Sequence, residues 1–383
     1  MQRREFLARV GQGLAIMAAP GISSTTFATT SSSGTSVVKL ALFGDLMTGR
    51  GLDQVMAHPG EPFLFEAYVR DARRYVELAE AVNGPIPRPV EPAYIWGDAL
   101  AELQRRSPDA RIVNLETAIT RSDDHWRGKG INYRMHPENI SSITAAGIDC
   151  CVLANNHTLD WGHPGLTETL ETLNRAGVIP AGAGHDREEA DRPAIVEIDG
   201  SCRIVVLSVG LGSSGIPPTW AATDSRPGVS LLPALTEREI GEIATRVDRA
   251  RLPGDVAVLS VHWGSNWGYA IPDRQRWFAH RLIDEAGVDV VHGHSSHHPR
   301  GIEVYRGKPI LYGCGDFLND YEGIGGHEQY RGDLVLMYCV SIDLATRKLS
   351  RLELSPFRIR RFRAEAATGR DVTWMRDTLS RLG

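Results

Sequence analysis

The chain has 383 residues, of which 42% are hydrophobic and 23% are charged, a composition typical of a globular protein with a large core. Its 42 basic and 47 acidic residues give a net charge of −5, so charge offers no support for nucleic acid or an anionic membrane as a partner. The five cysteines lack the spacing of a zinc site and are expected to be buried thiols rather than a disulfide framework.

The N-terminus has the features of an export signal. Arg3-Arg4-Glu5-Phe6-Leu7 has the form of a twin-arginine motif, and a weakly apolar segment follows it over residues 10–22. Residues 1–36 are therefore expected to be a signal peptide and a Ser/Thr-rich linker, which predicts a periplasmic or extracytoplasmic mature protein. No later run approaches the roughly 20 apolar residues of a membrane span, so no transmembrane segment is expected in the mature chain.

Strands and helices alternate along residues 37–383, which are expected to form a single domain. Apolar, β-branched runs predict strands at residues 37–43, 111–113, 150–153, 194–198, 203–209, 255–261, 288–291, 309–312 and 333–342. An Asp199-Gly200 turn predicts a hairpin between two of them. The alternation predicts the α/β class. Residues 51–110 are expected to be a less regular insertion and residues 350–383 a C-terminal extension.

Helical spacing marks four segments between the strands. Residues 65–82 have helical spacing and a mixed-charge face, and residues 237–251 are expected to form a surface helix. Leu166, Leu170 and Leu173 predict an amphipathic helix that ends at Gly177. A further helix is expected over residues 273–286, with Asp273 as its cap and Gly287 as its stop.

Polar side chains of metal-ligand type follow the predicted strands. They are Asp45 and Arg50; Asn114 and Glu116; Asn155, Asn156, His157 and Asp160; His262; His292, His294, His297 and His298; and Asp316. In α/β sheets, ligands bind at the carboxyl ends of the strands, because the loops there converge over a rigid platform. A set of carboxylates, imidazoles and amides suits Zn²⁺, Mn²⁺ or Fe²⁺ better than Ca²⁺. The pattern therefore predicts a site for divalent cations at these strand ends.

Taken singly, several of these residues have a structural alternative. Gly44-Asp45 could form a turn, Glu116 could cap a helix, and His262 could be a half-buried histidine with all its hydrogen bonds made. Their coincidence at several strand ends favours the metal site.

Five motifs occur in a fixed order over about residues 39–320. They are Gly44-Asp45-x-Met47-x-x-Arg50, Asn114-Leu115-Glu116, Asn155-Asn156-His157-x-x-Asp160-x-Gly162, His262-Trp263-Gly264 and Gly293-His294-x-x-His297. In this order they resemble the CapA family of bacterial capsule-synthesis proteins, which is linked to poly-γ-glutamate. The resemblance implies a fold like that of calcineurin-type metallophosphoesterases: a β-sandwich core flanked by helices, with the metals at one end.

The resemblance also implies a role for each residue of the site. One metal would be held by Asp45, Glu116 and His297. A second would be held by Asn156, His262 and His294, with Glu116 bridging the two. His157 would donate a proton to a leaving group, Asp160 would orient it, and Arg50 would grip an anionic group of the substrate. The cofactors would be one or two Mn, Zn or Fe ions.

Three positions depart from the family pattern. Met47 stands where a metallophosphoesterase usually has a ligand histidine, so the first metal site is expected to be weak or absent. Ser295-Ser296 replaces the middle histidine of the usual Gly-His-His-Pro-His motif. Asp316 replaces the usual asparagine of Gly-Asn-Phe, and it is either an extra carboxylate near the rim or a residue that caps a loop.

Three functions are compatible with these residues. The first is a metal-dependent hydrolase that acts in the cell envelope on a phosphoester or an acidic polymer. The second is a capsule assembly factor that binds poly-γ-glutamate or its synthesis machinery without turnover. The third is a peptide epimerase with His157 or Asp316 as the base. Fold and site chemistry do not by themselves decide among these pathway roles.

Overall fold

The computed structural model describes residues 37–198, 200 and 202–382. The predicted signal of residues 1–36, with its twin-arginine motif, lies outside the described residues, and so does Asp199 of the predicted hairpin turn. From Val37 onward the chain forms one compact unit. Among the described helices, none combines the length and the apolar character that crossing a membrane requires.

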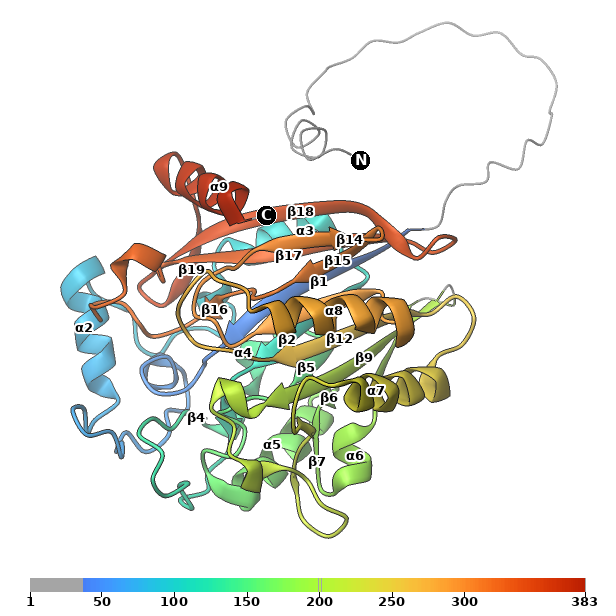
Figure 1. Ribbon diagram of the computed structural model, residues 1–383. Coiled ribbons are helices and arrows are strands. Elements are labelled where there is room, and N and C mark those ends of the chain that lie inside the picture. Colours follow the sequence, from blue (N-terminus) through green and yellow to red (C-terminus); the bar gives the residue numbers. More distant parts are fainter. Residues whose placement is uncertain (1–36, 199, 201, 383) are drawn as a thin grey trace, which may run out of the picture. The chain divides into compact units, whose positions relative to one another are not determined.

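Two large sheets form the centre of this unit (Figure 1). The first sheet has the order β19-β18-β17-β1-β2-β5-β6, with β16 beside β1. Its strands are β1 (Val37–Leu46), β2 (Ala110–Leu115), β5 (Cys150–Val152), β6 (Ile179–Ala181), β16 (Asp316–Leu318), β17 (Leu334–Asp343), β18 (Lys348–Arg360) and β19 (Arg363–Ala366). Strands β1, β2, β5 and β6 run parallel, and β17, β18 and β19 add antiparallel pairs.

The second sheet has the order β11-β9-β12-β13-β15-β14, with β8 beside β9. Its strands are β8 (Ala194–Ile198), β9 (Cys202–Leu211), β11 (Leu231–Leu232), β12 (Val256–His262), β13 (Val290–His294), β14 (Ile302–Tyr305) and β15 (Lys308–Leu311). The central strands β9, β12, β13 and β15 are parallel. Two small pairs complete the strands: β3 (Ala118–Ile119) with β4 (Arg134–Met135), and β7 (Ala183–Gly184) with β10 (Gly228–Val229).

The central strands are buried on both faces, which explains why they are continuous apolar runs in the sequence. In β1, Leu40 and Leu42 contribute to the core between the two sheets, whereas Ala41 and Phe43 contribute to the core beneath the helices. Strand β12 alternates in the same way, with Val258 in the core between the sheets. Successive side chains of a strand point to opposite faces, so each strand serves two cores.

Helices cover the outer face of each sheet. Apolar side chains of α2 (Arg73–Asn83), α3 (Ala99–Arg106) and α5 (Gly162–Arg175) pack on the first sheet. Those of α7 (Glu237–Ala250) and α8 (Asp273–Glu285) pack on the second sheet. The remaining α-helices of the described residues are α4 (Ser141–Thr144), α6 (Arg187–Asp191) and α9 (Arg370–Leu382). The predicted α/β sandwich flanked by helices is therefore confirmed.

Several local predictions were wrong in detail. The helix expected over residues 65–82 begins only at Arg73, because a short antiparallel turn with a Phe63–Asp71 bridge precedes it. Asp273 is the first residue of α8 and its side chain makes no cap hydrogen bond, so its carboxylate acts on the helix dipole instead. Apart from these predictions, β18 and β19 extend the first sheet from Lys348 onward.

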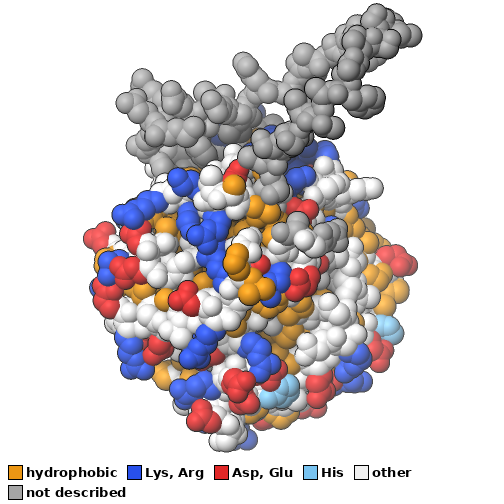
Figure 2. All heavy atoms as spheres, turned by 90° about the vertical axis from the view of Figure 1, so that its right-hand side faces the viewer, with side chains coloured by type: hydrophobic (Ala, Val, Ile, Leu, Met, Phe, Trp, Pro, Cys, Tyr) orange, Lys and Arg blue, Asp and Glu red, His pale blue; other side chains and the backbone are white. Residues whose placement is uncertain are grey.

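One expectation from composition holds for the described residues. Cys150, Cys151, Cys314 and Cys339 are buried thiols outside any disulfide. Figure 2 shows basic and acidic side chains interspersed on the face that it draws, which agrees with a chain whose opposite charges nearly balance.

Candidate metal centre

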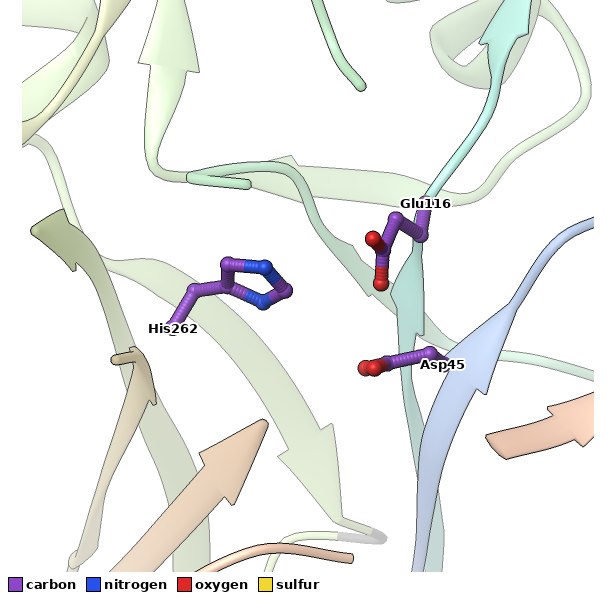
Figure 3. A group of neighbouring side chains, drawn as sticks. All are labelled: Asp45, Glu116 and His262. Atoms are coloured by element: carbon purple, nitrogen blue, oxygen red, sulfur yellow. The ribbon is translucent and has the colours of Figure 1, made fainter. Parts of the chain in front are cut away.

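Three buried side chains converge at the carboxyl ends of the central strands (Figure 3). Asp45 lies near the end of β1, Glu116 directly follows β2, and His262 is the last residue of β12 in the second sheet. One ligand-type atom of each lies within 4.8 Å of the others. In Figure 3 the two carboxylates lie on one side and the imidazole faces them from the other. The two sheets thus supply different ligand types to one point.

His294 and Asn156 border this group. His294 Nδ1 lies 3.6 Å from Asp45 Oδ1, and Asn156 Oδ1 lies 3.0 Å from His262 Nε2. Ser260 Oγ lies 2.6 Å from His294 Nε2 and so leaves the Nδ1 atom facing the carboxylates. The structure therefore brings five of the six ligands expected from the sequence into one cluster.

Unpartnered polar atoms test whether these residues fit a cation. Asp45 Oδ2, Glu116 Oε2 and His294 Nδ1 are buried and have no hydrogen-bond partner among the described residues. A buried polar atom without a partner costs about 1–3 kcal/mol, so three of them in one cluster indicate that something else satisfies them. Two carboxylate oxygens and an imidazole nitrogen are ligands that Zn²⁺, Mn²⁺ and Fe²⁺ accept. The residues fit a divalent cation.

The electrostatics of the cluster point the same way. Burial raises the pKa of Asp45 to about 7, and repulsion from Asp316 adds to the shift. Burial and the neighbouring Asp45 raise the pKa of Glu116 well above its usual range. Burial lowers the pKa values of His262 and His294 well below theirs. In this cluster the acids resist ionisation and the imidazoles resist protonation. A divalent cation would stabilise the cluster, because a bound cation favours ionised carboxylates together with neutral imidazoles.

A second group shares Asp45 with the first. Asp45, His297 and Asp316 also offer ligand-type atoms within 4.8 Å of one another. His297 Nδ1 lies 2.7 Å from Asp316 Oδ1, and its Nε2 lies 3.0 Å from Asn266 Nδ2. Burial opposes a charge on His297, but the Asp316 carboxylate outweighs it and raises the pKa of this histidine. The sequence led us to expect Glu116 as the residue common to two metals, whereas here Asp45 belongs to both groups.

His157 and Asp160 form a pair beside the cluster. His157 Nδ1 lies 2.6 Å from Asp160 Oδ2, while Nε2 lies 3.7 Å from Glu116 Oε1. The ring therefore spans the distance between Asp160 and the carboxylates. Burial lowers the pKa of His157 to about 4, although Asp160 opposes the shift, so the ring is neutral near pH 7.

Lys129 contacts both members of this pair, a role that the sequence did not predict. Its Nζ donates to the backbone oxygen of Asn156 and to Asp160 Oδ1, and it lies 2.9 Å from His157 Nδ1. Its side chain is only 17% exposed. A single lysine between two glycines, in a segment without regular structure, carries no signal of this role. Only the fold brings it to the site.

Amides behind the ligands hold the strand ends together. Asn155 Nδ2 donates to Asn114 Oδ1 and to the Leu115 backbone oxygen, at 3.0 and 2.8 Å. Asn155 Oδ1 accepts from the backbone nitrogen of His157 at 3.0 Å. Asn114 Nδ2 in turn donates to Asp45 Oδ1 at 2.8 Å. Asn155 thus secures the loop, and Asn114 fixes one oxygen of Asp45.

Arg50 is not brought into the cluster. Its guanidinium bonds Asp320 through Nε and Nη2 at 3.1 and 2.5 Å, and Glu66 through Nη1 at 2.9 Å. It is 4% exposed and lies against the rings of Tyr75 and Tyr133. With two buried carboxylates as partners, this cation stabilises the region around the site, and its predicted grip on an anionic substrate stays a prediction.

Three other residues noted in the sequence have their own partners. His292 Nε2 donates to the Phe43 backbone oxygen at 2.8 Å and so joins the two sheets. His298 Nε2 accepts from the Gly268 backbone nitrogen at 3.1 Å. The sulfur of Met47 accepts from Tyr321 Oη at 3.4 Å. Neither histidine belongs to the ligand groups.

Comparison with protein families and curated proteins gives consistent matches. A family model described as bacterial capsule synthesis protein PGA_cap matches residues 39–321. A probable polyglutamine synthesis accessory protein of Mycobacterium tuberculosis (strain H37Rv) is 50% identical over 347 residues, which is 90% of this chain and 91% of that protein. The PGA biosynthesis protein CapA of Bacillus subtilis is 26% identical over 286 residues, 74% of this chain and 64% of that protein.

Solved structures show more distant likenesses. A phosphatase from Mycoplasma pneumoniae matches with a TM-score of 0.47 and 11% identity, over 88% of this chain and 97% of that one. The calcineurin-like phosphoesterase YfkN from Bacillus subtilis matches with a TM-score of 0.43 and 12% identity, over 90% of this chain and 98% of that one.

Loss of ligands is the direct test of the cluster. We expect Asn156→Ala and His262→Ala to weaken the binding of Mn²⁺ by about 10- to 100-fold or more, because each removes a ligand-type atom. His163→Ala is the control, since His163 packs on Trp126 and belongs to neither ligand group. Isothermal titration of metal-stripped protein with Mn²⁺ measures the three affinities. Equal losses in all three variants would contradict the assignment.

Proposed function

The chain belongs to the PGA_cap family of bacterial capsule synthesis proteins, as its motifs predict, and from this premise we propose that it is a divalent-metal-dependent hydrolase. Its substrate is an anionic component of the cell envelope, either a phosphoester or an acidic polymer of the poly-γ-glutamate type. It acts as an accessory to the machinery that makes the capsule polymer.

One observation carries this proposal. One buried oxygen each of Asp45 and Glu116 and one nitrogen of His294 have no partner among the described residues. His157 Nε2 faces the same point, 3.7 Å from Glu116 Oε1. A module that only binds polymer has no need for an imidazole held by a carboxylate beside a metal-ligand cluster. A hydrolase needs the metal-ligand cluster and also the imidazole, because proton transfer must accompany bond cleavage.

The metal ligands would be Asp45, Glu116, Asn156, His262 and His294. His297 and Asp45 would be ligands of the second group. A divalent cation held there supplies a Lewis acid for the substrate oxygen and lowers the pKa of water, so that hydroxide is available near neutral pH.

The chain's own residues move the proton. In the tautomer in which Nδ1 donates to Asp160 Oδ2, the neutral His157 ring carries its proton on Nδ1 and has an open lone pair on Nε2. His157 Nε2 can therefore take a proton from the nucleophile first and deliver it to the leaving group afterwards. The sequence suggested donation alone, and the geometry supports both steps in turn.

Lys129 positions this pair. One ammonium group joins the backbone of Asn156 to the carboxylate of Asp160, so it links a metal ligand to the residue that orients His157. Its charge also offsets that of Asp160, which would otherwise be buried beside a neutral ring. Lys129 therefore keeps the distance between His157 and the cluster constant.

We place this activity outside the cytoplasm. Arg3-Arg4 would direct the twin-arginine route, which carries folded proteins and so allows the cations to be loaded before export.

Metal-dependent turnover is the central test of the function. Mature protein is stripped, reloaded with Mn²⁺, Zn²⁺ or Fe²⁺, analysed for bound metal, and screened on aryl phosphomonoesters, phosphodiesters and poly-γ-glutamate. We expect turnover of one class, and a loss of roughly 100-fold or more in Glu116→Gln, because that change removes a ligand charge and keeps the shape. Glu171→Gln, on the exposed face of α5, is the matched control and should retain full activity.

Other outcomes would assign the protein elsewhere. A metal-loaded protein that retains poly-γ-glutamate in a pull-down but turns over no substrate would make it an assembly factor. Uptake of solvent deuterium at a peptide α-carbon without cleavage would make it an epimerase. Absence of bound transition metal in folded, reloaded protein would contradict the hydrolase.

Replacement of Lys129 should separate positioning from binding. With the substrate identified by the screen, we expect Lys129→Met to lower kcat by about 10- to 100-fold and to leave KM nearly unchanged, with partial rescue by Lys129→Arg. Lys308→Met is the matched control, because Lys308 is similarly buried and paired with Asp289 but contacts no residue of the site. A rise in KM alone would show that Lys129 binds substrate instead.

Export can be tested separately from chemistry. We expect an Arg3→Lys, Arg4→Lys double variant to stay in the cytoplasm, because both arginines are required by the twin-arginine route. Fractionation of cells that express the full chain measures this. Normal export of the double variant would contradict the assignment.

A further inference from the structure

Two aspartates stand side by side at the edge of the centre. In the parallel pairing of β1 with β16, Asp45 is directly opposite Asp316. Both are buried, at 0% and 2% exposure. Like charges this close repel each other strongly out of water, so such a pair needs either a proton on one member or a positive group between or beside the two.

The backbone is built to allow this close approach. A side chain at position 44 would place its first carbon 1.7 Å from the Gly315 backbone oxygen, so only glycine fits there. Gly315 itself has a φ of 76°, in the region that favours glycine. The Asp45 backbone nitrogen donates to that same Gly315 oxygen at 2.9 Å. A glycine before each aspartate thus sets the two carboxylates next to each other.

His297 completes the group, and one oxygen remains open. Its Nδ1 lies 2.7 Å from Asp316 Oδ1, while Asn319 Nδ2 donates to Asp316 Oδ2 at 2.9 Å. Asp45 Oδ1 accepts from Asn114, and Asp45 Oδ2 is buried without a partner among the described residues. The open oxygen therefore belongs to the residue that the two ligand groups share.

Met47 occupies the position where a histidine ligand was expected. Its side chain is fully buried and its sulfur accepts from Tyr321 Oη at 3.4 Å. The Tyr321 ring also packs edge-on against His297, with ring centres 5.5 Å apart. A thioether is a poor ligand for a hard divalent cation, so this position supplies nothing to the second group.

We propose that Asp316 replaces the missing ligand at position 47, so that Asp45, His297 and Asp316 hold a second divalent cation and Asp45 bridges the two cations. This inference rests on the proposed metal site and specifies it. The three carboxylates of Asp45, Glu116 and Asp316 carry more negative charge than one divalent cation neutralises, whereas two divalent cations neutralise all of it. The departures at positions 47 and 316 then compensate each other.

The alternative role of Asp316 is to orient His297 through its hydrogen bond. Asp316→Asn separates the two roles, because the amide oxygen still accepts from His297 Nδ1–H while the ligand charge is lost. If Asp316 only orients the ring, the variant binds metal like the wild type. If it is a ligand, the second cation is lost.

The experiment counts Mn²⁺ per chain. Metal-stripped mature protein is titrated with Mn²⁺, and the bound ion is measured by calorimetry, elemental analysis and electron paramagnetic resonance. We expect two Mn²⁺ with an exchange-coupled signal in the wild type, and one Mn²⁺ with an isolated signal in Asp316→Asn. Asp343→Asn, the same change at the last residue of β17 and away from the centre, should keep both ions. Met47→His in the Asp316→Asn background should restore the second ion.

Each contrary result has a distinct meaning. Two ions bound by Asp316→Asn with wild-type affinity would overturn the ligand role of Asp316. One ion in the wild type, together with metal-dependent turnover, would overturn the second position and leave the proposed function intact. No bound ion in the folded wild type would overturn both. Circular dichroism of each variant checks whether the fold is retained.

Discussion

Burial of like charges is the constraint on which the centre of this protein depends. Asp45, Glu116 and Asp316 are held almost completely out of water, where an uncompensated carboxylate costs several kcal/mol. Hydrogen bonds from Asn114 and Asn319 offset a part of that cost. Protonation lowers the remaining cost, since the pKa of Asp45 is raised to about 7, and a cation beside the unpartnered oxygens would lower it further.

The two sheets divide the ligand set between them. The first sheet supplies oxygen ligands, because Asp45 ends β1, Glu116 follows β2 and Asn156 follows β5. The second sheet supplies imidazoles from His262 and His294 at the ends of β12 and β13. The centre therefore exists only when the sheets pack face to face, so folding of the sandwich and assembly of the centre are coupled.

Two buried cations near the centre have different surroundings and different consequences. Arg50 is bonded to two carboxylates and has no direct contact with the ligands. Lys129 shares one carboxylate with His157 and also bonds the backbone of Asn156. The planar guanidinium of arginine suits a fixed ion pair with carboxylates, whereas the compact ammonium of lysine can donate to several groups at one point. Of the two, Lys129 is the one that contacts His157 and Asp160, so the proposed mechanism gives a role to Lys129 and none to Arg50.

The sequence by itself determined the α/β class and named most of the residues that meet at the candidate metal centre. Apolar runs that end in Asp45, Glu116, Asn156 and His262 are local patterns, and parallel strands bring their carboxyl ends together in any sheet of this class. Chain order of the motifs also identified the family. These patterns depend only on neighbouring residues or on their order along the chain, so they can be read without knowledge of the packing.

Only the tertiary structure decided which residues meet across long sequence distances. Lys129 reaches the site through a segment with no periodic pattern, and Arg50 bonds Asp320, which lies 270 positions further along the chain. Asp316 stands beside Asp45 because β16 pairs with β1, which no local propensity encodes. Pairing register and side-chain direction arise from the packing of the whole sandwich, and they decide which carboxylate two cations could share.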